Sequence, residues 1–306
     1  LQGLLKYFGH GLPGRDREGN PILLNLLGKL DVEGLFQSCQ SKDYIKMHLF
    51  NVEMGLRLAA RTSDQKTEEK ILLVMDLFNL TTSHYSYKPF TNTFLTLVAL
   101  FQENYPDIFK KIVLIRAPAV AKIAFNLLRP FLSEKTTAVV EMPGDEWKDV
   151  LFRYVDPEKW PAYWGGSLIE DGDEKCPSKV NFGIDVVSKE DYYDPSKDKD
   201  EYTEVTVYAG NVHTVEVDIK NEGTVLRWKY KTVMEDIGFS IYIEDSKTDP
   251  YDIVYPYIRL ECSLIPVENE MSCDRKGKYI LEFDNRYSWF SAKELSYVVY
   301  LQDAGD

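Results

Sequence analysis

Acidic and hydroxyl side chains gather after an apolar stretch that runs from Ile71 to Leu77. Asp76 lies near the end of that stretch, and Thr81 and Ser83 follow it closely. Catalytic groups of α/β proteins lie at the carboxyl ends of strands, so a hydrolase that uses Asp76 and Ser83 is one interpretation. In the other interpretation, Asp76 caps a loop and the hydroxyls satisfy the turn backbone. No set of nucleophile, base and orienting group can be completed here, so we predict no catalytic residues and no enzyme.

A second candidate pair of charges is Asp107 and Arg129. Each has an ordinary role, because an acid after a proline suits the start of a short helix and an arginine in an apolar helix reaches out to water. In the alternative, Arg129 donates to a phosphate while Asp107 accepts from a sugar or inositol hydroxyl. Thr81 and Ser83 suit a polar headgroup at the mouth of a pocket. These four residues form the predicted headgroup site.

Other motifs predict no cofactor and no metal. Gly9, Gly11 and Gly14 match the spacing of the dinucleotide fingerprint, which requires a helix that starts at once. Pro13 and the polar run RDREGNP are found there instead, so we expect a flexible entrance loop. The four histidines have no ligand spacing, and the four cysteines contain no CxxC pair. The sequence therefore predicts neither a metal site nor a disulfide framework, and we expect reduced cytosolic thiols.

Charge divides the chain into two parts. Of 36 basic and 49 acidic residues, residues 1–170 hold 20 and 20, whereas residues 171–306 hold 16 and 29. An acidic surface repels phosphate backbones, which excludes nucleic acid as a partner and leaves no polybasic patch for anionic membranes. No apolar run reaches the roughly 20 residues that span a bilayer, and no signal peptide opens the chain. We expect a cytoplasmic protein whose transient membrane contacts depend on apolar insertion.

The first part of the chain alternates strands with helices. Apolar runs at PILLNLLG, ILLVMDL and KIVLI, and a weaker one at TTAVVEM, are typical of strands in a mostly parallel sheet. Three helices are predicted, because apolar residues recur every three or four positions. The first begins at about Lys42, the second follows ILLVMDL and runs to Asn104, and the third is DEWKDVLFRYV. This alternation predicts an α/β domain within residues 1–170, with a mixed, mostly parallel sheet covered by helices.

The most informative element is the run AVAKIAFNLLRPFL, residues 119–132, in which ten of fourteen residues are apolar. A helix that is apolar on most sides must contact apolar material on both. It is either wedged inside protein, or it borders a cavity or a membrane. We predict the second: a mobile gate that bends near Pro130, where a backbone hydrogen bond is lost. The predicted gate and cavity residues are Val120, Ile123, Ala124, Phe125, Leu127, Leu128, Phe131 and Leu132.

The second part of the chain has a different pattern. Residues 171–204 are charged and poor in aliphatic side chains, which is typical of a linker or a solvated strap. After them, short β-branched and aromatic runs such as TVLRWKY, GFSIYIED and KYILEFDN alternate with turns. Residues 205–303 are therefore predicted to form an all-β sandwich of jelly-roll or Greek-key type.

Several stretches carry a resemblance to a known family. YPDIFKKIVLIRAPAVAKIAFNLLRPFLSEKT, with VMDLFNLTTS before it and VDPEKWPAYWGGSL after it, resembles the lipid-binding lobe of CRAL-TRIO proteins. KCPSKVNFG and LEFDNRYSWFSAKEL extend the resemblance to family members that carry a C-terminal GOLD domain, from about Leu4 to the last strand. The resemblance implies a lobe with a lipid cavity, no cofactor other than the bound lipid, and ligands of the phosphatidylinositol, tocopherol or squalene class.

The resemblance also implies roles for individual residues. Residues 119–132 look like the family's gate helix. Asp107 lies where phosphoinositide-binding members carry Glu after Tyr-Pro, and Arg129 lies where they carry Lys before Pro-Phe. Thr81 and Ser83 lie near hydroxyls that members use for a choline headgroup. Family members possess an N-terminal helical lobe before the point at which this sequence starts.

Two functions follow as hypotheses. The first is an intracellular lipid-binding and transfer protein that encloses one hydrophobic lipid and opens at a membrane. Extracting a lipid with about 30 methylenes, at roughly 0.8 kcal/mol each, requires about 25 kcal/mol of replacement apolar contact, which a sheet and an apolar helix can supply. The second is a membrane-recruited adaptor whose GOLD domain binds a protein partner.

Overall fold

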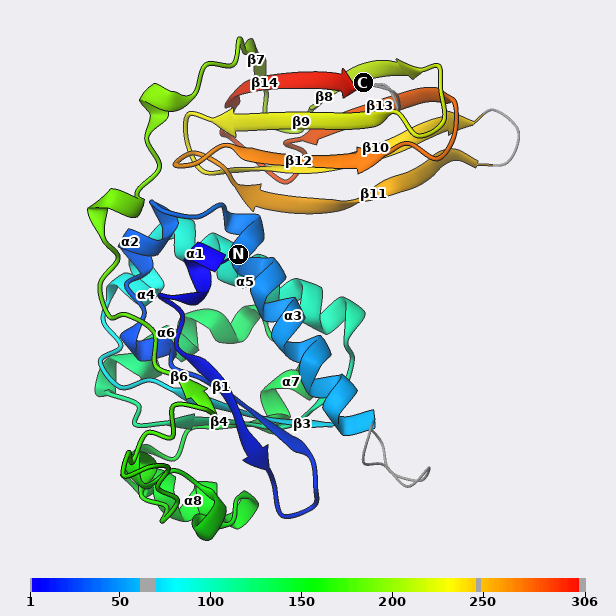
Figure 1. Ribbon diagram of the computed structural model, residues 1–306. Helices are drawn as coiled ribbons and strands as arrows, with labels where there is room; N and C mark the ends of the chain where they lie inside the picture. The colour runs from blue at the N-terminus through cyan, green and yellow to red at the C-terminus, as the bar shows by residue number, and fades with distance from the viewer. Residues whose placement is uncertain (1, 61–69, 246–248, 303–306) are drawn as a thin grey trace. The chain divides into compact units, whose positions relative to one another are not determined.

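The computed structural model describes residues 2–60, 70–245 and 249–302. These residues form two compact units. The first contains the residues up to Cys39 together with Asp43–Tyr192, and the second contains Gln40–Lys42 together with the residues from Tyr193 onward. The first is an α/β unit and the second is built from antiparallel strands, which confirms the predicted fold class (Figure 1).

The first unit is built around one six-stranded sheet with the strand order β5-β4-β3-β2-β1-β6. β2, β3, β4 and β5 run parallel, whereas β1 is antiparallel to both β2 and β6. The sheet is therefore mixed and mostly parallel, as predicted. The strands are β1 His10–Arg15, β2 Pro21–Asn25, β3 Ile71–Asp76, β4 Phe109–Ile115, β5 Val140–Glu141 and β6 Val180–Asn181.

Helices cover both faces of this sheet. α3, α5, α6 and α7 lie on one side of it, and α8 lies on the other (Figure 1). The α-helices are α1 Gln2–Leu5, α2 Val32–Phe36, α3 Ser41–Ala60, α4 Ser83–Ser86, α5 Lys88–Asn104, α6 Ala119–Leu128, α7 Glu134–Val139 and α8 Trp147–Tyr154. The 3-10 turns are η1 Leu27–Lys29, η2 Arg129–Phe131, η3 Gly144–Glu146, η4 Pro157–Lys159, η5 Ala162–Trp164, η6 Lys189–Asp191 and η7 Pro195–Lys197.

Alternate residues of each strand point to opposite faces of the sheet. One face packs closely against α8 and the segment that follows it, and we call it the packed face. Its strand residues are at most 1% exposed. They are Ile22, Leu24, Leu72, Val74, Val113 and Ile115, which form one core with Val150, Leu151, Trp160 and Trp164. Burial of this continuous apolar layer stabilises the unit.

The glycine motif near the N-terminus was wrongly predicted as a flexible entrance loop. His10–Arg15 forms strand β1, which pairs with β2 on one side and β6 on the other. Gly11 allows this close pairing, because a Cβ atom at this position would overlap the backbone oxygen of Lys179. The glycine at this position therefore serves sheet packing.

The weaker strand predicted at TTAVVEM is confirmed only in part. Most of this run belongs to helix α7, and only Val140–Glu141 joins the sheet. The β-branched residues favour a strand by propensity. Ser133 instead caps the N-terminus of a helix, because its hydroxyl accepts a hydrogen bond from the backbone N–H of Thr136.

The predicted gate helix is shorter than residues 119–132. Helix α6 ends at Leu128, and Arg129–Phe131 continues as a 3-10 turn. Pro130 explains the change, because its ring excludes the α-helical hydrogen-bonding pattern at this point. We keep the name gate segment for residues 119–132. No helix starts at Asp107, which lies in a turn with a φ of 60°.

The predicted linker, residues 171–204, is only partly a linker. Residues 171–192 belong to the first unit. Cys176, Val180 and Val187 are buried there, and Val180 starts the edge strand β6. Single apolar residues among the charged ones pack this segment against the first unit. The average composition of the segment does not reveal them. The residues from Tyr193 onward cluster with the second unit.

The second unit consists of two four-stranded sheets, with the orders β11-β10-β13-β8 and β12-β9-β14-β7. Every described pair of strands is antiparallel. Aromatic rings fill the interior; the Tyr230 and Phe239 rings, one from each sheet, lie 5.0 Å apart. The strands are β7 Thr203–Val207, β8 Val212–Ile219, β9 Val225–Thr232, β10 Asp236–Asp245, β11 Asp249–Glu261, β12 Val267–Ser272, β13 Gly277–Asp284 and β14 Lys293–Gln302.

Candidate functional site

The face of the first sheet opposite the packed face borders a cavity, and we call it the cavity face. The cavity volume is about 340 Å³, within the range of roughly 300–1,000 Å³ common for small-molecule pockets. Its floor consists of strand residues that alternate with those of the packed face. They are Leu23 and Asn25 of β2, Leu73 and Met75 of β3, and Ile112 and Leu114 of β4.

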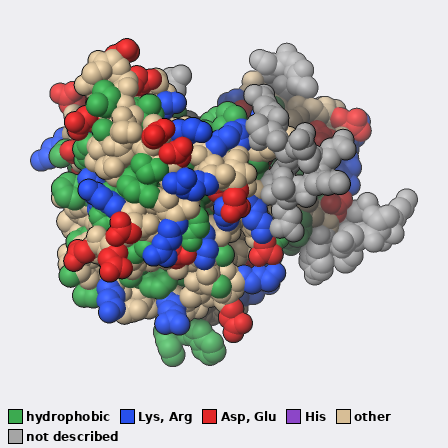
Figure 2. Space-filling model, turned by 90° about the horizontal axis from the view of Figure 1, so that it is seen from below, with side chains coloured by type: hydrophobic (Ala, Val, Ile, Leu, Met, Phe, Trp, Pro, Cys, Tyr) green, Lys and Arg blue, Asp and Glu red, His purple; other side chains and the backbone are tan. Residues whose placement is uncertain are grey.

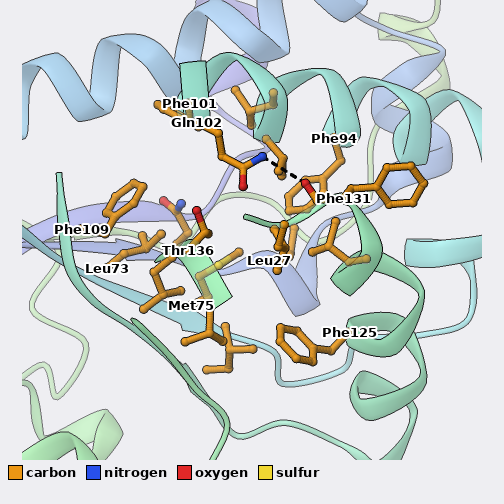
Figure 3. A pocket seen from close by; sticks show the side chains of 18 of the residues that line it. Leu27, Leu73, Met75, Phe94, Phe101, Gln102, Phe109, Phe125, Phe131 and Thr136 are labelled. Atoms are coloured by element: carbon orange, nitrogen blue, oxygen red, sulfur yellow. Dashed lines mark hydrogen bonds between the residues drawn. The ribbon is translucent and has the colours of Figure 1, made fainter. Parts of the chain in front are cut away.

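Helix α5 forms one wall of the cavity. Its apolar residues recur every three or four positions, which places them along one side of the helix. Figure 3 shows Phe94 and Phe101 of this helix around the same space as Leu73 and Met75 of the floor. The residues of α5 that carry this wall are Phe90, Phe94, Leu97, Val98 and Phe101.

The gate segment forms another wall and is also exposed. Ile123, Leu127 and Phe131 are 53%, 54% and 56% exposed. The segment therefore presents apolar surface both to the cavity and to solvent, and it is not embedded among protein side chains. Val120 and Ile123 do not line the cavity. The predicted residues that do line it are Ala124, Phe125, Leu127, Leu128, Phe131 and Leu132.

A glutamine on α5 holds the end of the gate segment. The Gln102 Nε2 atom donates to the backbone oxygen of Phe131 at 3.1 Å (Figure 3). Its Oε1 atom accepts from the backbone N–H of Ser133 at 2.6 Å. We call this pair of bonds the Gln102 tether. Since each hydrogen bond contributes about 0.5–1.5 kcal/mol net, the tether stabilises the observed position of this segment only modestly.

Two of the predicted headgroup residues, Asp107 and Arg129, lie in different surroundings. Asp107 lines the cavity and pairs with Lys135, with 3.0 Å between Oδ2 and Nζ. Lys135 also lines the cavity, and the Lys135 and Asp107 side chains are 77% and 53% exposed. An ion pair this exposed contributes little stability and is easily exchanged for another partner. Arg129 is exposed and does not line the cavity.

The other two, Thr81 and Ser83, border a separate hollow of about 280 Å³. The Ser83 hydroxyl donates to Oε1 of Glu33 at 2.7 Å, and Oγ1 of Thr81 lies 3.2 Å from Nδ1 of His84. His84 lines both hollows, and burial lowers its pKa. The structure therefore divides the four predicted headgroup residues among the cavity, the second hollow and the exposed surface.

Asp76 has a structural role at the end of β3. Its carboxylate is buried and accepts hydrogen bonds from Nε of Arg116 at 3.0 Å and from the indole N–H of Trp164 at 2.8 Å. It also accepts from the backbone N–H of Phe78 at 3.0 Å. These bonds fasten Trp164 to the sheet across 88 residues of sequence. Asp76 and Ser83 do not pair, since the Ser83 hydroxyl donates to Glu33 instead.

Two polar residues of the cavity lining escaped the sequence analysis. Asn25 and His48 are 5% and 8% exposed. Neither Oδ1 of Asn25 nor Nε2 of His48 has a hydrogen-bond partner among the described residues. Burial, with a smaller effect of His10, lowers the pKa of His48 to about 3, so its ring is neutral at physiological pH. A signal was present in the sequence, because each is a polar residue within an otherwise apolar pattern.

The side chains that line the cavity suit an apolar ligand. Apart from a few polar groups, the cavity is surrounded by aliphatic and aromatic side chains. Within residues 2–60, 70–245 and 249–302, no group of three or more His, Cys, Asp or Glu side chains is placed to hold a metal ion. In that same part of the chain, no helix combines the length and the apolarity needed to cross a membrane.

Comparisons with known proteins agree with this geometry. Residues 5–166 match the CRAL/TRIO domain. The chain is similar to protein ctg-1 of Caenorhabditis elegans, with 43% identity over 308 residues that cover 98% of this chain and 80% of that protein. It is 26% identical over 261 residues to the CRAL-TRIO domain-containing protein T23G5.2 of the same organism, which covers 80% of this chain and 35% of that protein.

Among solved structures, the chain is similar to Sfh5, with a TM-score of 0.39 and 20% identity over 46% of this chain and 48% of that one. The residues that match the CRAL/TRIO domain, 5–166, include the whole lining of the cavity. The sequence match, the mixed sheet and the apolar cavity agree with one another. The chain belongs to the CRAL/TRIO domain family, whose members bind and transfer lipids.

Proposed function

We propose that this protein carries one water-insoluble lipid, enclosed between the cavity face of the sheet and the gate segment. The observation that carries the proposal is the cavity itself. Side chains from three strands and several helices surround about 340 Å³ that protein atoms do not fill. Protein interiors are otherwise packed like organic crystals, so a cavity of this size within an apolar layer calls for a ligand.

The energetics favour an apolar guest. A lipid that leaves a bilayer loses about 0.8 kcal/mol of favourable environment for each methylene that meets water. The cavity restores that environment, because phenyl rings of α5 and the gate segment face aliphatic side chains of the sheet. The acyl chains of the lipid are shielded from water both in the bilayer and in the cavity. The free energies of the lipid in these two apolar surroundings are therefore nearly equal.

Loading requires the gate segment to move. Helix α6 ends at Leu128, and Pro130 lies in the 3-10 turn that follows, so this point has fewer helical hydrogen bonds to break. The Gln102 tether is the polar attachment that opening must disrupt. Its loss is offset by water or lipid headgroups that bond to the freed backbone groups.

The outer face of the gate segment is the proposed membrane contact. Ile123 presents an exposed apolar side chain there, and Leu127 and Phe131 are exposed as well as lining the cavity. These side chains would enter the boundary between headgroups and acyl chains. On the face shown in Figure 2, Lys and Arg side chains are interspersed with Asp and Glu side chains. We propose apolar insertion of these side chains, rather than attraction between opposite charges, as the source of membrane affinity.

The proposed ligands are lipids of the phosphatidylinositol, tocopherol or squalene class. Asp107 remains the proposed acceptor for a headgroup hydroxyl. Lys135, which pairs with Asp107 and lines the cavity, is better placed than Arg129 to donate to a headgroup phosphate. Thr81 and Ser83 border the second hollow, where they could bond a second polar group of the ligand.

Lipid extraction of the protein purified from cells tests the proposal. Mass spectrometry of the extract should recover one lipid species, or one class, at close to one molecule per chain. A protein of equal purity without the cavity, expressed in the same cells, gives the background. An extract that matches the background would contradict the proposal.

A second function is favoured by the surface of the second unit. Large apolar side chains are exposed in the connections β7–β8, β9–β10 and β13–β14: Tyr208 65%, Val233 65%, Met234 71%, Trp289 87% and Phe290 95%. These connections lie at one end of the sandwich, because Gly210 N–H donates to the Asn285 oxygen and Val233 N–H donates to the Glu294 oxygen. Exposed apolar groups of this kind mark interaction surfaces.

We propose on this ground an adaptor role in which this loop end of the sandwich, with its GOLD resemblance, binds a protein partner. Replacing Trp289→Ser together with Phe290→Ser tests it. If the protein is a carrier, this variant should transfer lipid between vesicles as the parent does. If the protein is an adaptor, the variant should no longer be recruited by its protein partner in cells. Normal recruitment of the double variant would contradict the adaptor role.

A further inference from the structure

The cavity has a polar recess formed by Asn25 and His48. Both side chains are more than nine-tenths buried and both line the cavity. Oδ1 of Asn25 and Nε2 of His48 lack partners among the described residues. Buried polar atoms in folded proteins are nearly always hydrogen-bonded. Two such atoms in one cavity therefore call for a polar group on whatever fills it.

The two side chains come from different elements but line the same cavity and share His10 as a neighbour. Asn25 ends β2 and is opposite His10 in the register of β1 and β2. His10 is near enough to His48 to contribute to the lowering of its pKa. The ring of Phe8, which precedes β1, lies 4.9 Å from the ring of His48. His10 of β1 is thus a neighbour of both Asn25 and His48.

The recess lies at the opposite end of the sheet from the charged pair of the lining. Asn25 is opposite Met75, near the carboxyl end of β3. Asp107 precedes Phe109, which is opposite Ile71 at the amino end of β3. Four residues of strand separate these levels, which is about 13 Å. Asp107 and Lys135 pair with each other, so neither charge serves the recess.

The chemistry of the recess selects a neutral group. The amide oxygen of Asn25 accepts a hydrogen bond, and a neutral imidazole with its proton on Nε2 donates one. A hydroxyl satisfies both, since it donates to Asn25 and accepts from His48. A carboxylate or phosphate would be buried without a cation, which is costly. A hydrocarbon would leave both protein groups unpaired.

We propose that Asn25 and His48 form a subsite that binds the hydroxyl group of a lipid alcohol, whose apolar body extends along the cavity face of the sheet. This subsite rests on the proposed lipid-carrier function and narrows its ligand class. It specifies which end of the ligand is innermost. The hydroxyl lies in the recess, and the opposite end of the lipid points toward Asp107 and Lys135.

Two probes and a matched pair of variants test the subsite. The probes are 1-hexadecanol and hexadecane, which share a chain and differ in one hydroxyl. The variants are Asn25→Leu and Asn51→Leu, because Asn51 is a buried asparagine with an unpartnered amide that does not line the cavity. The quantity measured is the ratio of the two dissociation constants within each protein. Retained hexadecane binding shows that the cavity of a variant is intact.

The subsite predicts that Asn25→Leu shifts this ratio against 1-hexadecanol by about tenfold or more, the effect of one lost hydrogen bond to a buried partner. His48→Phe should shift it in the same direction, and Asn51→Leu should leave it unchanged. A ratio that stays within twofold in Asn25→Leu, as expected if only water occupies the recess, would overturn the subsite alone. A parent protein that binds neither probe would overturn the lipid-carrier function and the subsite with it.

Discussion

The two faces of the first sheet differ in what covers them. Leu72 and Leu73 are neighbours in β3, yet Leu72 lies on the packed face at 0% exposure and Leu73 lies on the cavity face at 8%. Large indoles, Trp160 and Trp164, fill the space beneath the packed face. On the cavity face, α5 and the gate segment surround a cavity instead. Alternating strand residues make both faces apolar, so the covering elements decide which face can hold a ligand.

The two faces of the sheet contribute differently to the stability of the first unit. A packed face gains dispersion contacts from every side chain, whereas a face that borders a cavity loses those contacts until a ligand restores them. The first unit therefore combines a stable layer with a layer whose stability depends on its occupant.

The largest effect is expected from the paired substitutions Leu72→Ala and Leu73→Ala. Leu72→Ala removes side-chain atoms from a filled layer and should lower the free energy of unfolding by about 3–5 kcal/mol. Leu73→Ala enlarges a cavity that already exists and should cost roughly 1–2 kcal/mol less. Urea unfolding of the lipid-free proteins measures both values. If the two substitutions lowered the free energy of unfolding equally, the packed face and the cavity face would not differ in packing as described.

The next effect concerns acid and His48. The folded protein holds the pKa of His48 at about 3, whereas the unfolded value is about 6.5. Between these values the unfolded chain binds a proton that the folded chain does not, so stability falls as the pH is lowered through this window. The loss from pH 6.5 to pH 5 should be about 2 kcal/mol.

His48→Phe tests the assignment of that pH dependence. The neighbours of the ring are Phe8, Tyr44 and His10, and the variant keeps an aromatic ring among them. Its free energy of unfolding should change with pH less steeply than that of the parent across the same window. An unchanged slope would mean that another group binds the proton.

A smaller effect is expected from the Gln102 tether, which belongs to the cavity side alone. Gln102→Leu removes both bonds of the tether, one to Phe131 in the gate segment and one to Ser133 directly after it, and keeps the cavity apolar. If opening limits exchange, lipid transfer between vesicles should accelerate about fivefold, which corresponds to roughly 1 kcal/mol. Gln37→Leu, at a glutamine that bonds to the Glu33 backbone instead, serves as the control. Equal rates in the two variants would show that the tether does not limit opening.

The smallest effect is expected from Lys135→Ala. Its ion pair with Asp107 is exposed, so the free energy of unfolding should change by less than about 1 kcal/mol. Transfer of phosphatidylinositol should nevertheless weaken if Lys135 donates to the headgroup phosphate, while transfer of an uncharged lipid should not. Arg129→Ala is the comparison, because the sequence predicts Arg129 as the phosphate donor. A loss of phosphatidylinositol transfer only in Arg129→Ala would restore the original prediction.

The sequence predicted the elements that depend on periodicity. The buried strand at Ile71, the amphipathic helix at Trp147 and the change to an all-β second part all follow from the spacing of apolar residues. The apolar excess of residues 119–132 also predicted a segment with apolar surface on two sides. In each case the signal is local, so neighbouring residues are sufficient to recognise it.

Features that depend on distant residues could not be predicted in this way. Asp76 is satisfied by Trp164, 88 residues away, and strand β6 pairs with β1 from within a segment whose composition is that of a linker. Ser133 overrides the strand propensity of its neighbours through one capping bond. Asn25 and His48 are visible as polar exceptions, but only the fold shows that their polar atoms lack partners in one cavity.

Native mass spectrometry of two alanine-to-tryptophan variants, purified from the same cells as the parent, tests the central claim most directly. Ala124→Trp on α6 places an indole in the cavity, whereas Ala99→Trp places one on the exposed side of α5. A lipid carrier predicts an added mass of one lipid on the parent and on Ala99→Trp, and its loss from Ala124→Trp. A parent without such a mass, or an Ala124→Trp variant that retains it, would contradict the claim that this cavity holds the lipid.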